Sequence, residues 1–473
     1  MSKRELVWIA AVALLLYLWV GPATAKRDAL YPDYETMSTI VDRVLDSYVD
    51  KVDPQKLFYG AYDGMMATLD PYSNFLPPQG KEDLDINTVG EFGGLGIEIT
   101  TDERKVLMVE TPLEGTPAFY AGVRPGDRIV EIEGKTARPD PTKTRIEILN
   151  DAVKRLRGPK GTKVRIRVFH ADTRTYEDFT IVRDIIKVKS IVSAKMVDEK
   201  AGIGYIRMSQ FQQHTAQELD ETVKGLPQKG MKAMVLDLRF NPGGLLDSAV
   251  EVADRFIREG VIVSTKGRAP DSDRVFKATG GPTYPDFPLA VLITGRSASA
   301  SEILAGAVKD HHRGIIVGTR SFGKASVQTV IPLEGNKSAI KLTTAKYYTP
   351  SGKLIHRGPE SKEEDQWGIQ PDLKVEMSFE EVLQLVELWR KEHVVQTPPK
   401  EGEKPAPPNE AKQPNRDDMM DLLGPAAEPE EAPTEEGITK KPKAEKKPFV
   451  DRQLEAAVSA LQGAILEHDR LAK

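Results

Sequence analysis

The chain has 473 residues, which is enough for two or three domains. Its formal net charge of −5 gives no support for a nucleic-acid-binding protein. It has no cysteine, which excludes disulfides, cysteine nucleophiles and cysteine-ligated metals. None of its seven histidines lies in an HExxH or HxH arrangement. We therefore expect no metal and no cofactor.

The N-terminal segment has the pattern of a targeting signal. Lys3 and Arg4 precede an apolar run from Leu6 to Val20, and an Ala-x-Ala ending follows at Ala25. This predicts a secretory signal peptide over residues 1–25. The alternative is an uncleaved anchor in the inner membrane, but the run is shorter than the roughly 20 residues of a bilayer span. In both cases we expect an exported protein of the periplasm or cell envelope, where a lack of cysteine is compatible with oxidising conditions.

The next two segments differ in their patterns of apolar residues. Residues 30–85 are predicted to be helical, as a packing or dimerisation module. Residues 86–190 contain short β-branched runs separated by Gly and Pro, which predicts a small β-rich domain with one or two helices. One helix face in the first segment is apolar and comprises Met37, Ile40, Val41, Val44, Leu45 and Tyr48.

The rest of the chain falls into three parts. Residues 191–395 alternate between strands and helices, which predicts an α/β core with a largely buried sheet. Residues 396–448 hold 11 of the 33 prolines among Glu and Lys, which predicts a disordered linker. Residues 449–473 form a last amphipathic helix, expected to dock on the folded body or on a partner subunit. Its apolar face comprises Leu454, Val458, Leu461 and Ile465.

The candidate chemistry lies in the α/β core. Ser299 stands in a run of small residues that opens a helix, where free N–H groups suit an oxyanion. Lys324 stands in a Gly-flanked turn and can act as base if it is kept in an apolar, carboxylate-poor pocket. Gln328 can orient its amine without adding charge. The pair Gly243 and Gly244, after a predicted strand, can turn a backbone N–H toward the same oxyanion.

Each of these residues also has an ordinary structural explanation. A serine-rich helix start is ordinarily an N-cap, a lone loop lysine is ordinarily solvated, and Gly-Gly after a strand is ordinarily a turn. His311 and His312 suggest a Ser-His-Asp triad, but they lie about 18 Å along the helix from Ser299. We reject the triad.

Taken together, the motifs resemble the C-terminal processing peptidases, a tail-specific serine protease family with a PDZ domain. The resemblance covers about residues 33–375 and returns at the last helix. Five motifs carry it: SASASEILAGAVKD (297–310), FGKASVQ (322–328), LDLRFNPGGLL (236–246), YYTPSGKLIHR (347–357) and GIQPD (368–372).

The resemblance implies a fold and a set of roles. The fold would be a crotonase- or ClpP-like α/β core with an inserted PDZ domain and helical segments at both ends. Ser299 would be the nucleophile, Lys324 the general base and Gln328 the residue that positions it. Ala300 and Gly243 would supply the oxyanion N–H groups, with Gly244 as the fallback, and Asp310 would be a structural member of the site. One departure is Ala325, where the family usually has Gly; a methyl group is tolerable there unless φ must be positive.

The β-rich domain contains a loop similar to the carboxylate-binding loop of PDZ domains. Backbone N–H groups around Leu95, Gly96 and Ile97 would hold the terminal carboxylate of a peptide that adds as a strand. Apolar Leu95 and Ile97 imply a preference for apolar C-terminal residues. Arg157 matches an arginine that links PDZ docking to the active site in some relatives; alternatively it pairs only with a surface carboxylate.

We therefore predict an exported serine endopeptidase that binds free apolar C-termini and cleaves through a Ser-Lys dyad and an acyl-enzyme. A catalytically silent PDZ scaffold of the cell envelope is the alternative. A crotonase-like acyl-CoA enzyme is a third hypothesis, disfavoured by the export signal and the PDZ domain. The expected partners are protein or peptide substrates, with a homo-oligomer or an adaptor protein left open and no nucleic acid.

Overall fold

The computed structural model describes residues 30–393 and 449–471 except for short gaps, namely 103, 138, 139, 141, 227–229, 282, 283, 359 and 363. The predicted signal peptide (1–25) and the predicted linker (396–448) lie outside the described residues. Among the helices that are described, none combines the length and the apolar character required for a bilayer span. The chain forms two compact units. The first takes residues up to Lys81 together with Gln328–Thr343, and the second takes the rest.

The first unit combines N-terminal helices with strands from much later in the chain. It contains a helix over 30–47, α2 (Pro54–Ala67), β1 (Asn74–Leu76), most of β17 (Ser326–Leu333) with the short turn η3 (Glu334–Asn336), and the first part of β18 (Ser338–Tyr348). Asp53 caps α2 by accepting the Gln55 N–H at 2.9 Å. β1 pairs antiparallel with β18, with Phe75 opposite Ile340.

Part of the second unit is a small β-rich domain. An antiparallel sheet runs β3 (Ile97–Thr101), β4 (Leu107–Pro112), β5 (Arg128–Ile132), β7 (Lys163–His170) and β8 (Thr175–Val182), with β6 (Lys135–Thr136) on β5. The domain follows α3 (Pro78–Val89), and its other elements are α4 (Pro117–Ala121), α5 (Arg145–Leu156) and the pair β2 (Glu91–Gly94) and β9 (Asp184–Lys187). A capping box between Thr144 and Glu147 starts α5, one of the helices expected in this domain.

The α/β core is built on a six-stranded sheet in the order β10-β11-β12-β15-β16-β19. β10 is antiparallel to β11 and the other neighbours are parallel. The strands are β10 (Ile191–Asp198), β11 (Ile203–Met208), β12 (Ala233–Asp237), β15 (Leu289–Ile293), β16 (Ile315–Gly318) and β19 (Leu373–Lys374). The helices are α6 (Thr215–Gly225), α7 (Leu246–Asp254), α8 (Ala300–Asp310), α9 (Phe379–His393) and α11 (Arg452–Leu471).

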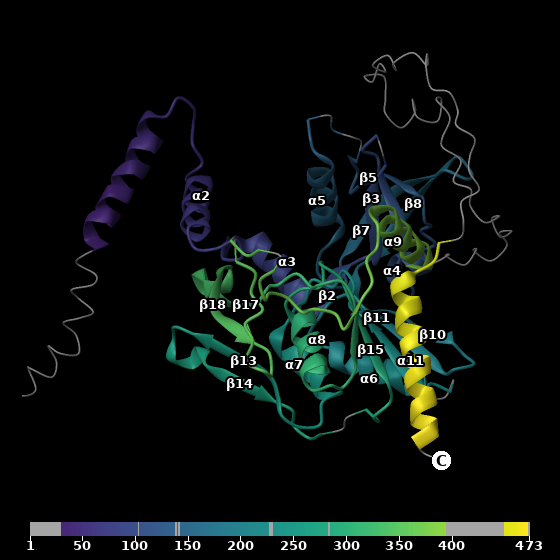
Figure 1. The fold of residues 1–473 in the computed structure, drawn as a ribbon. Helices are drawn as coiled ribbons and strands as arrows, with labels where there is room; N and C mark the ends of the chain where they lie inside the picture. The colour runs from purple at the N-terminus through teal and green to yellow at the C-terminus, as the bar shows by residue number, and fades with distance from the viewer. Residues whose placement is uncertain are drawn as a thin grey trace, which may run out of the picture. The chain divides into compact units, whose positions relative to one another are not determined.

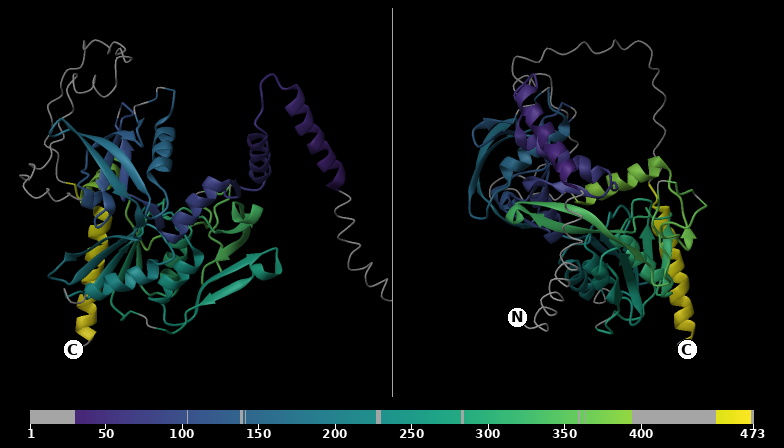
Figure 2. Two further views of the ribbon diagram at one scale, coloured as in Figure 1. Left: turned by 180° about the vertical axis from the view of Figure 1, so that it is seen from behind. Right: turned by 90° about the vertical axis from the view of Figure 1, so that its left-hand side faces the viewer.

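Successive residues of the central strands fill two separate cores, because side chains alternate across a strand. Met234 and Leu236 pack with α6, α7 and α8 on one face. Ala233 and Val235 pack with Ala457 of α11 on the other. The C-terminal helix runs along this second face (Figures 1 and 2). Since parallel strands end at one edge, the loops after β12, β15 and β16 meet there.

A long antiparallel ribbon was not predicted. β13 (Val261–Gly267) pairs with β14 (Arg274–Lys277), across the short turn η2 (Pro270–Ser272), and with Ala345–Tyr348 of β18. Most residues of β14 and β17 are exposed or half-buried, so the hydrophobic pattern that reveals buried strands is weak there.

Candidate active site

Ser299 occupies a strained turn between β15 and α8. Its backbone has φ 55° and ψ −113°, outside the regions that residues with side chains ordinarily adopt. Such strain costs about 1–3 kcal/mol and persists only where the surrounding structure enforces it, often at active sites. Ser299 is half-buried, whereas Ser297 and Ser301 are fully buried with their hydroxyls on main-chain carbonyl oxygens, at 2.7 and 3.0 Å. The geometry therefore distinguishes Ser299 from its two neighbours.

Lys324 lies in the loop that follows β16. The preceding Gly323 has φ 85°, and a Cβ there would lie 2.9 Å from the Arg357 Cβ, so glycine is required. The loop is joined to the serine run, because the Phe322 N–H donates to the Ser297 carbonyl oxygen at 3.0 Å. Lys324 itself is half-buried. Ala325 is not among the described residues with positive φ, so its methyl group is accommodated.

Glu302 connects the serine and lysine segments and was not among the predicted site residues. Its Oε2 accepts the backbone N–H groups of Ser299 at 2.8 Å and Lys324 at 2.9 Å. Its Oε1 accepts the Ser321 hydroxyl at 2.5 Å and the Gly323 N–H at 2.6 Å. One carboxylate thus fixes the main chain at both candidate catalytic residues.

The protonation of Glu302 bears on the lysine. Burial raises the pKa of the Glu302 carboxyl, although the Ser321 hydroxyl and the three N–H groups act to lower it. Few carboxylates were expected near Lys324, and Glu302 is one that the sequence analysis missed. All four donors are satisfied by the ionised form, so Glu302 acts as a carboxylate bonded to the main chain of the lysine loop.

Tyr347 forms a second connection between the two segments. Its hydroxyl lies 3.1 Å from the carbonyl oxygen of Ser299 and 2.7 Å from that of Lys324. Burial, with Glu302 nearby, raises the pKa of Tyr347 well above its usual value, so the hydroxyl stays neutral and remains a donor.

The predicted oxyanion groups lie beside Ser299. A Cβ built on Gly243 would lie 2.8 Å from the Ser299 Cβ and 2.9 Å from the Ala300 nitrogen, which shows how closely this backbone approaches the serine. Ala300 begins α8, so its N–H has no acceptor within the helix. The Gly243 N–H, however, donates to Asn241 Oδ1 at 2.9 Å. Gly244 instead lies against the backbone of Phe211.

Two other predicted residues form hydrogen bonds to other parts of the chain. Gln328 belongs to the first unit, where its amide donates to the Thr343 hydroxyl at 3.2 Å. Asp310 ends α8, about 16 Å along the helix from Ser299. Its carboxylate accepts the Ser351 N–H at 2.9 Å. Asp310 therefore holds the turn after β18 and does not contact the serine.

The β-rich domain carries an apolar pocket at the predicted carboxylate-binding loop. Gly96 has φ 75°, and a Cβ there would lie 2.3 Å from the Thr116 side chain. Leu95 is buried in the domain core. The pocket is lined by Phe92, Gly94, Leu95, Gly96, Ile97, Ile99, Val153, Leu156 and Arg157. All four predicted residues of the loop and rim therefore face one pocket.

Arg157 makes two contacts at the pocket rim. Its guanidinium lies over the Phe92 ring, 4.7 Å from the centroid, and its Nη1 donates to Asp83 Oδ1 at 2.9 Å. Asp83 belongs to α3, which precedes the domain.

Among the described residues, no group of three or more His, Asp or Glu side chains is placed to hold a metal ion.

Three contributors were missed by the sequence analysis: Glu302, Tyr347 and Asn241. A signal existed for the first, since Ser299-x-x-Glu302 before an apolar run is the capping-box pattern. Tyr347 reaches the site only through long-range contacts, which local patterns do not encode. Asn241 bonds the Gly243 N–H two residues on, a local turn of the kind that Asn favours.

Comparisons with known proteins agree with this architecture. Residues 202–375 match the model for peptidase family S41, and residues 108–168 match that for the PDZ domain. A carboxy-terminal-processing protease of Bartonella bacilliformis is 41% identical over 80% of this chain and 84% of its own length. The carboxy-terminal processing protease CtpB of Bacillus subtilis is 34% identical over 76% of each chain.

Among solved structures, the photosystem II D1 C-terminal processing protease is 30% identical, with a TM-score of 0.41, over 71% of this chain and 85% of that one. The predicted fold class, an α/β peptidase core with a PDZ domain, is confirmed. The chain belongs to the carboxy-terminal processing proteases, serine-type peptidases of family S41 that carry a PDZ domain.

Proposed function

We propose that the protein is an exported endopeptidase that cleaves proteins recognised by their free C-termini, with Ser299 as nucleophile and Lys324 as general base. The observation that carries this proposal is the Glu302 carboxylate, whose Oε2 accepts both the Ser299 and the Lys324 N–H groups. That contact holds a serine in a strained, half-buried turn next to the lysine loop.

The proposed reaction proceeds in two steps. Neutral Lys324 takes the proton of the Ser299 hydroxyl as the serine oxygen attacks the scissile carbonyl carbon. Lys324 then gives that proton to the leaving amine, and an ester on Ser299 remains. Water, deprotonated by Lys324, hydrolyses the ester and restores the serine. Gln328 positions the lysine amine in this scheme.

The oxyanion of each step would be bound by the N–H groups of Ala300 and Gly243. Gly243 is preferred over Gly244 because its backbone approaches the Ser299 Cβ. Since the Gly243 N–H donates to Asn241 Oδ1, binding the oxyanion requires that hydrogen bond to be exchanged. We propose that substrate entry drives this exchange.

The PDZ pocket would select the substrate. A peptide C-terminus would place its carboxylate at the N–H groups of Leu95–Ile97 and an apolar last side chain in the pocket. Arg157 would link occupancy of the pocket to the catalytic core, because it lies on the pocket rim and bonds Asp83 of α3. Residues 1–25 would direct export.

Cleavage of casein and of a peptide with an apolar C-terminus tests the dyad. We expect Ser299→Ala and Lys324→Ala each to lower kcat at least about a thousandfold. Lys337→Ala, at an exposed lysine, is the matched control and should cleave like the wild type. Retention of wild-type cleavage by either dyad variant would show that the assignment is wrong.

The same assay separates the proposal from the alternative, a catalytically silent PDZ scaffold. If the protein were a scaffold, the wild-type chain would bind the peptide with an apolar C-terminus and yield no product. A protease that uses an acyl-enzyme should release the first product in a burst of about one equivalent per chain when deacylation is slow.

A further inference from the structure

A buried ion cluster is formed by residues that come just before the loop that holds Gly243. We call residues 240–244, which follow β12, the oxyanion loop. Arg239 precedes this loop, and its side chain is fully buried, as is that of Asp237. Arg239 donates to Asp237 from Nε at 3.0 Å and from Nη2 at 2.6 Å. Asp237 also accepts the Tyr205 hydroxyl at 2.8 Å.

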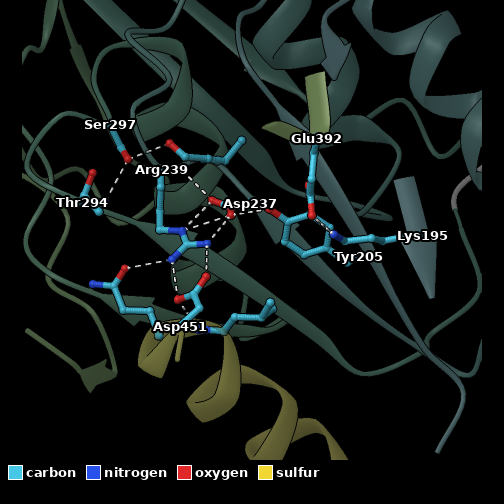
Figure 3. A network of polar contacts seen from close by, with 11 residues as sticks. Lys195, Tyr205, Asp237, Arg239, Thr294, Ser297, Glu392 and Asp451 are labelled. Atoms are coloured by element: carbon cyan, nitrogen blue, oxygen red, sulfur yellow. Dashed lines mark hydrogen bonds and ion pairs between the residues drawn. The ribbon is translucent and has the colours of Figure 1, made fainter. Parts of the chain in front are cut away.

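The cluster is completed by the C-terminal segment. Nη1 and Nη2 of Arg239 donate in parallel to the two carboxylate oxygens of Asp451, both at 2.8 Å. Nη1 also lies 3.3 Å from Gln453 Oε1. Figure 3 shows Asp451 reaching Arg239 from the start of the C-terminal helix. A buried guanidinium needs acceptors for all of its N–H groups, and Asp451 supplies two of them.

The chain next to Arg239 is strained. Phe240 has φ 62°, which is unfavourable for a residue with a side chain. Its ring packs edge-on against Trp389 of α9, with centroids 5.7 Å apart, and the Arg239 guanidinium lies 5.2 Å from the same indole. Contacts on both sides therefore hold the backbone just before Asn241 and Gly243.

We propose that Asp451 is a positioning residue for catalysis: by fixing Arg239, docking of the C-terminal helix holds the oxyanion loop beside Ser299. This inference rests on the proposed function, since it concerns the oxyanion site of the same reaction. The C-terminal helix is then part of the catalytic machinery as well as the cover of one sheet face.

Variants of the full chain test the proposal. Asp451 accepts the Leu454 N–H at 3.1 Å and so also caps α11. Asp451→Asn keeps an oxygen for the cap and removes the charge, whereas Asp451→Ala removes both. The control is Arg452→Ala on the next residue, which loses an exposed pair with Glu381 and a bond to the Glu376 carbonyl oxygen but no contact with Arg239. The readouts are kcat and KM on the tailed peptide, and hydrogen exchange of a peptic fragment covering residues 238–246.

We expect Asp451→Asn to lower kcat about tenfold to a hundredfold, the size of effect that a misplaced catalytic group produces. KM should stay near the wild-type value, because no residue of the PDZ pocket is changed. Exchange of residues 238–246 should be faster than in the wild type, and Arg452→Ala should change neither readout.

A wild-type kcat in Asp451→Asn would overturn the proposal, and so would a loss confined to Asp451→Ala, because the cap alone would then matter. If Asp451→Asn loosens the whole core, the test uses Gln453→Ala instead. This variant removes a neutral acceptor of Arg239 Nη1, and the same changes in kcat, KM and exchange are expected. If the wild type itself cleaves nothing, the proposed function fails, and the exchange measurement alone decides. Faster exchange in Asp451→Asn than in Arg452→Ala supports the positioning role, and equal exchange overturns it.

Discussion

At the scale of single residues, Glu302 is a side chain whose chemistry is set by its surroundings. Each of its two oxygens accepts two donors. Oε2 accepts one from the serine segment and one from the lysine loop, and Oε1 accepts two from the lysine loop. An acceptor-only carboxylate satisfies all four donors, which no neutral side chain of the same size can do. The same burial that raises its pKa makes any loss of these bonds expensive.

Glu302→Gln should therefore damage the site although it changes little in volume. The amide nitrogen would face two donors and leave them unsatisfied, at a cost of about 1–3 kcal/mol for each. We expect a lower free energy of unfolding and a loss of peptide cleavage, measured by urea denaturation and by kcat. Glu251→Gln, on an exposed position of α7, is the control. Wild-type cleavage by Glu302→Gln would show that the four bonds do not organise the dyad.

At the scale of elements, loops at strand ends place the functional groups, and their glycines differ in what they require. Gly96 and Gly126 both lie in the β-rich domain, with φ 75° and 87°. A Cβ on Gly96 would collide with Thr116, whereas a Cβ on Gly126 meets nothing within 4 Å. The two positions thus separate the cost of positive φ from the cost of a collision.

Gly96→Ala should weaken peptide binding, because the collision displaces the loop whose N–H groups are proposed to hold the carboxylate. We expect Kd for a peptide with an apolar C-terminus to rise at least about tenfold, which is about 1.4 kcal/mol. Fluorescence anisotropy measures this directly. Gly126→Ala should bind like the wild type, and equal binding by both variants would place the carboxylate site elsewhere.

At the scale of the whole second unit, the central sheet has two cores, and the one opposite α6–α8 takes its helical side chains from α11. Leu461 of α11 is 2% exposed in that core, whereas Leu466, one turn further on, is 71% exposed. The register of the helix on the sheet therefore makes one leucine structural and leaves the other in solvent.

Leu461→Ala should loosen the docked helix. Removing a buried leucine side chain costs about 2–5 kcal/mol, whereas Leu466→Ala should stay within about 0.5 kcal/mol of the wild type. Hydrogen exchange of residues 452–471 should become faster only in Leu461→Ala. Equal protection in both variants would mean that this core does not hold the helix.

The sequence by itself determined which local segments are candidates for the chemistry. Small residues around Ser299, the glycine before Lys324 and the Gly243–Gly244 pair are visible because turns and helix starts need particular residue types nearby. The alternation of apolar residues in β12 and the apolar face of the last helix likewise follow from local periodicity. These features predicted the α/β core, the β-rich domain and the candidate nucleophile.

Only the tertiary structure decided which of these segments meet. The bond between Glu302 and the Lys324 N–H spans 22 positions, and that between Arg239 and Asp451 spans 212. Their chemistry depends on burial and on exact hydrogen-bond geometry, which arise when distant strands and helices pack together.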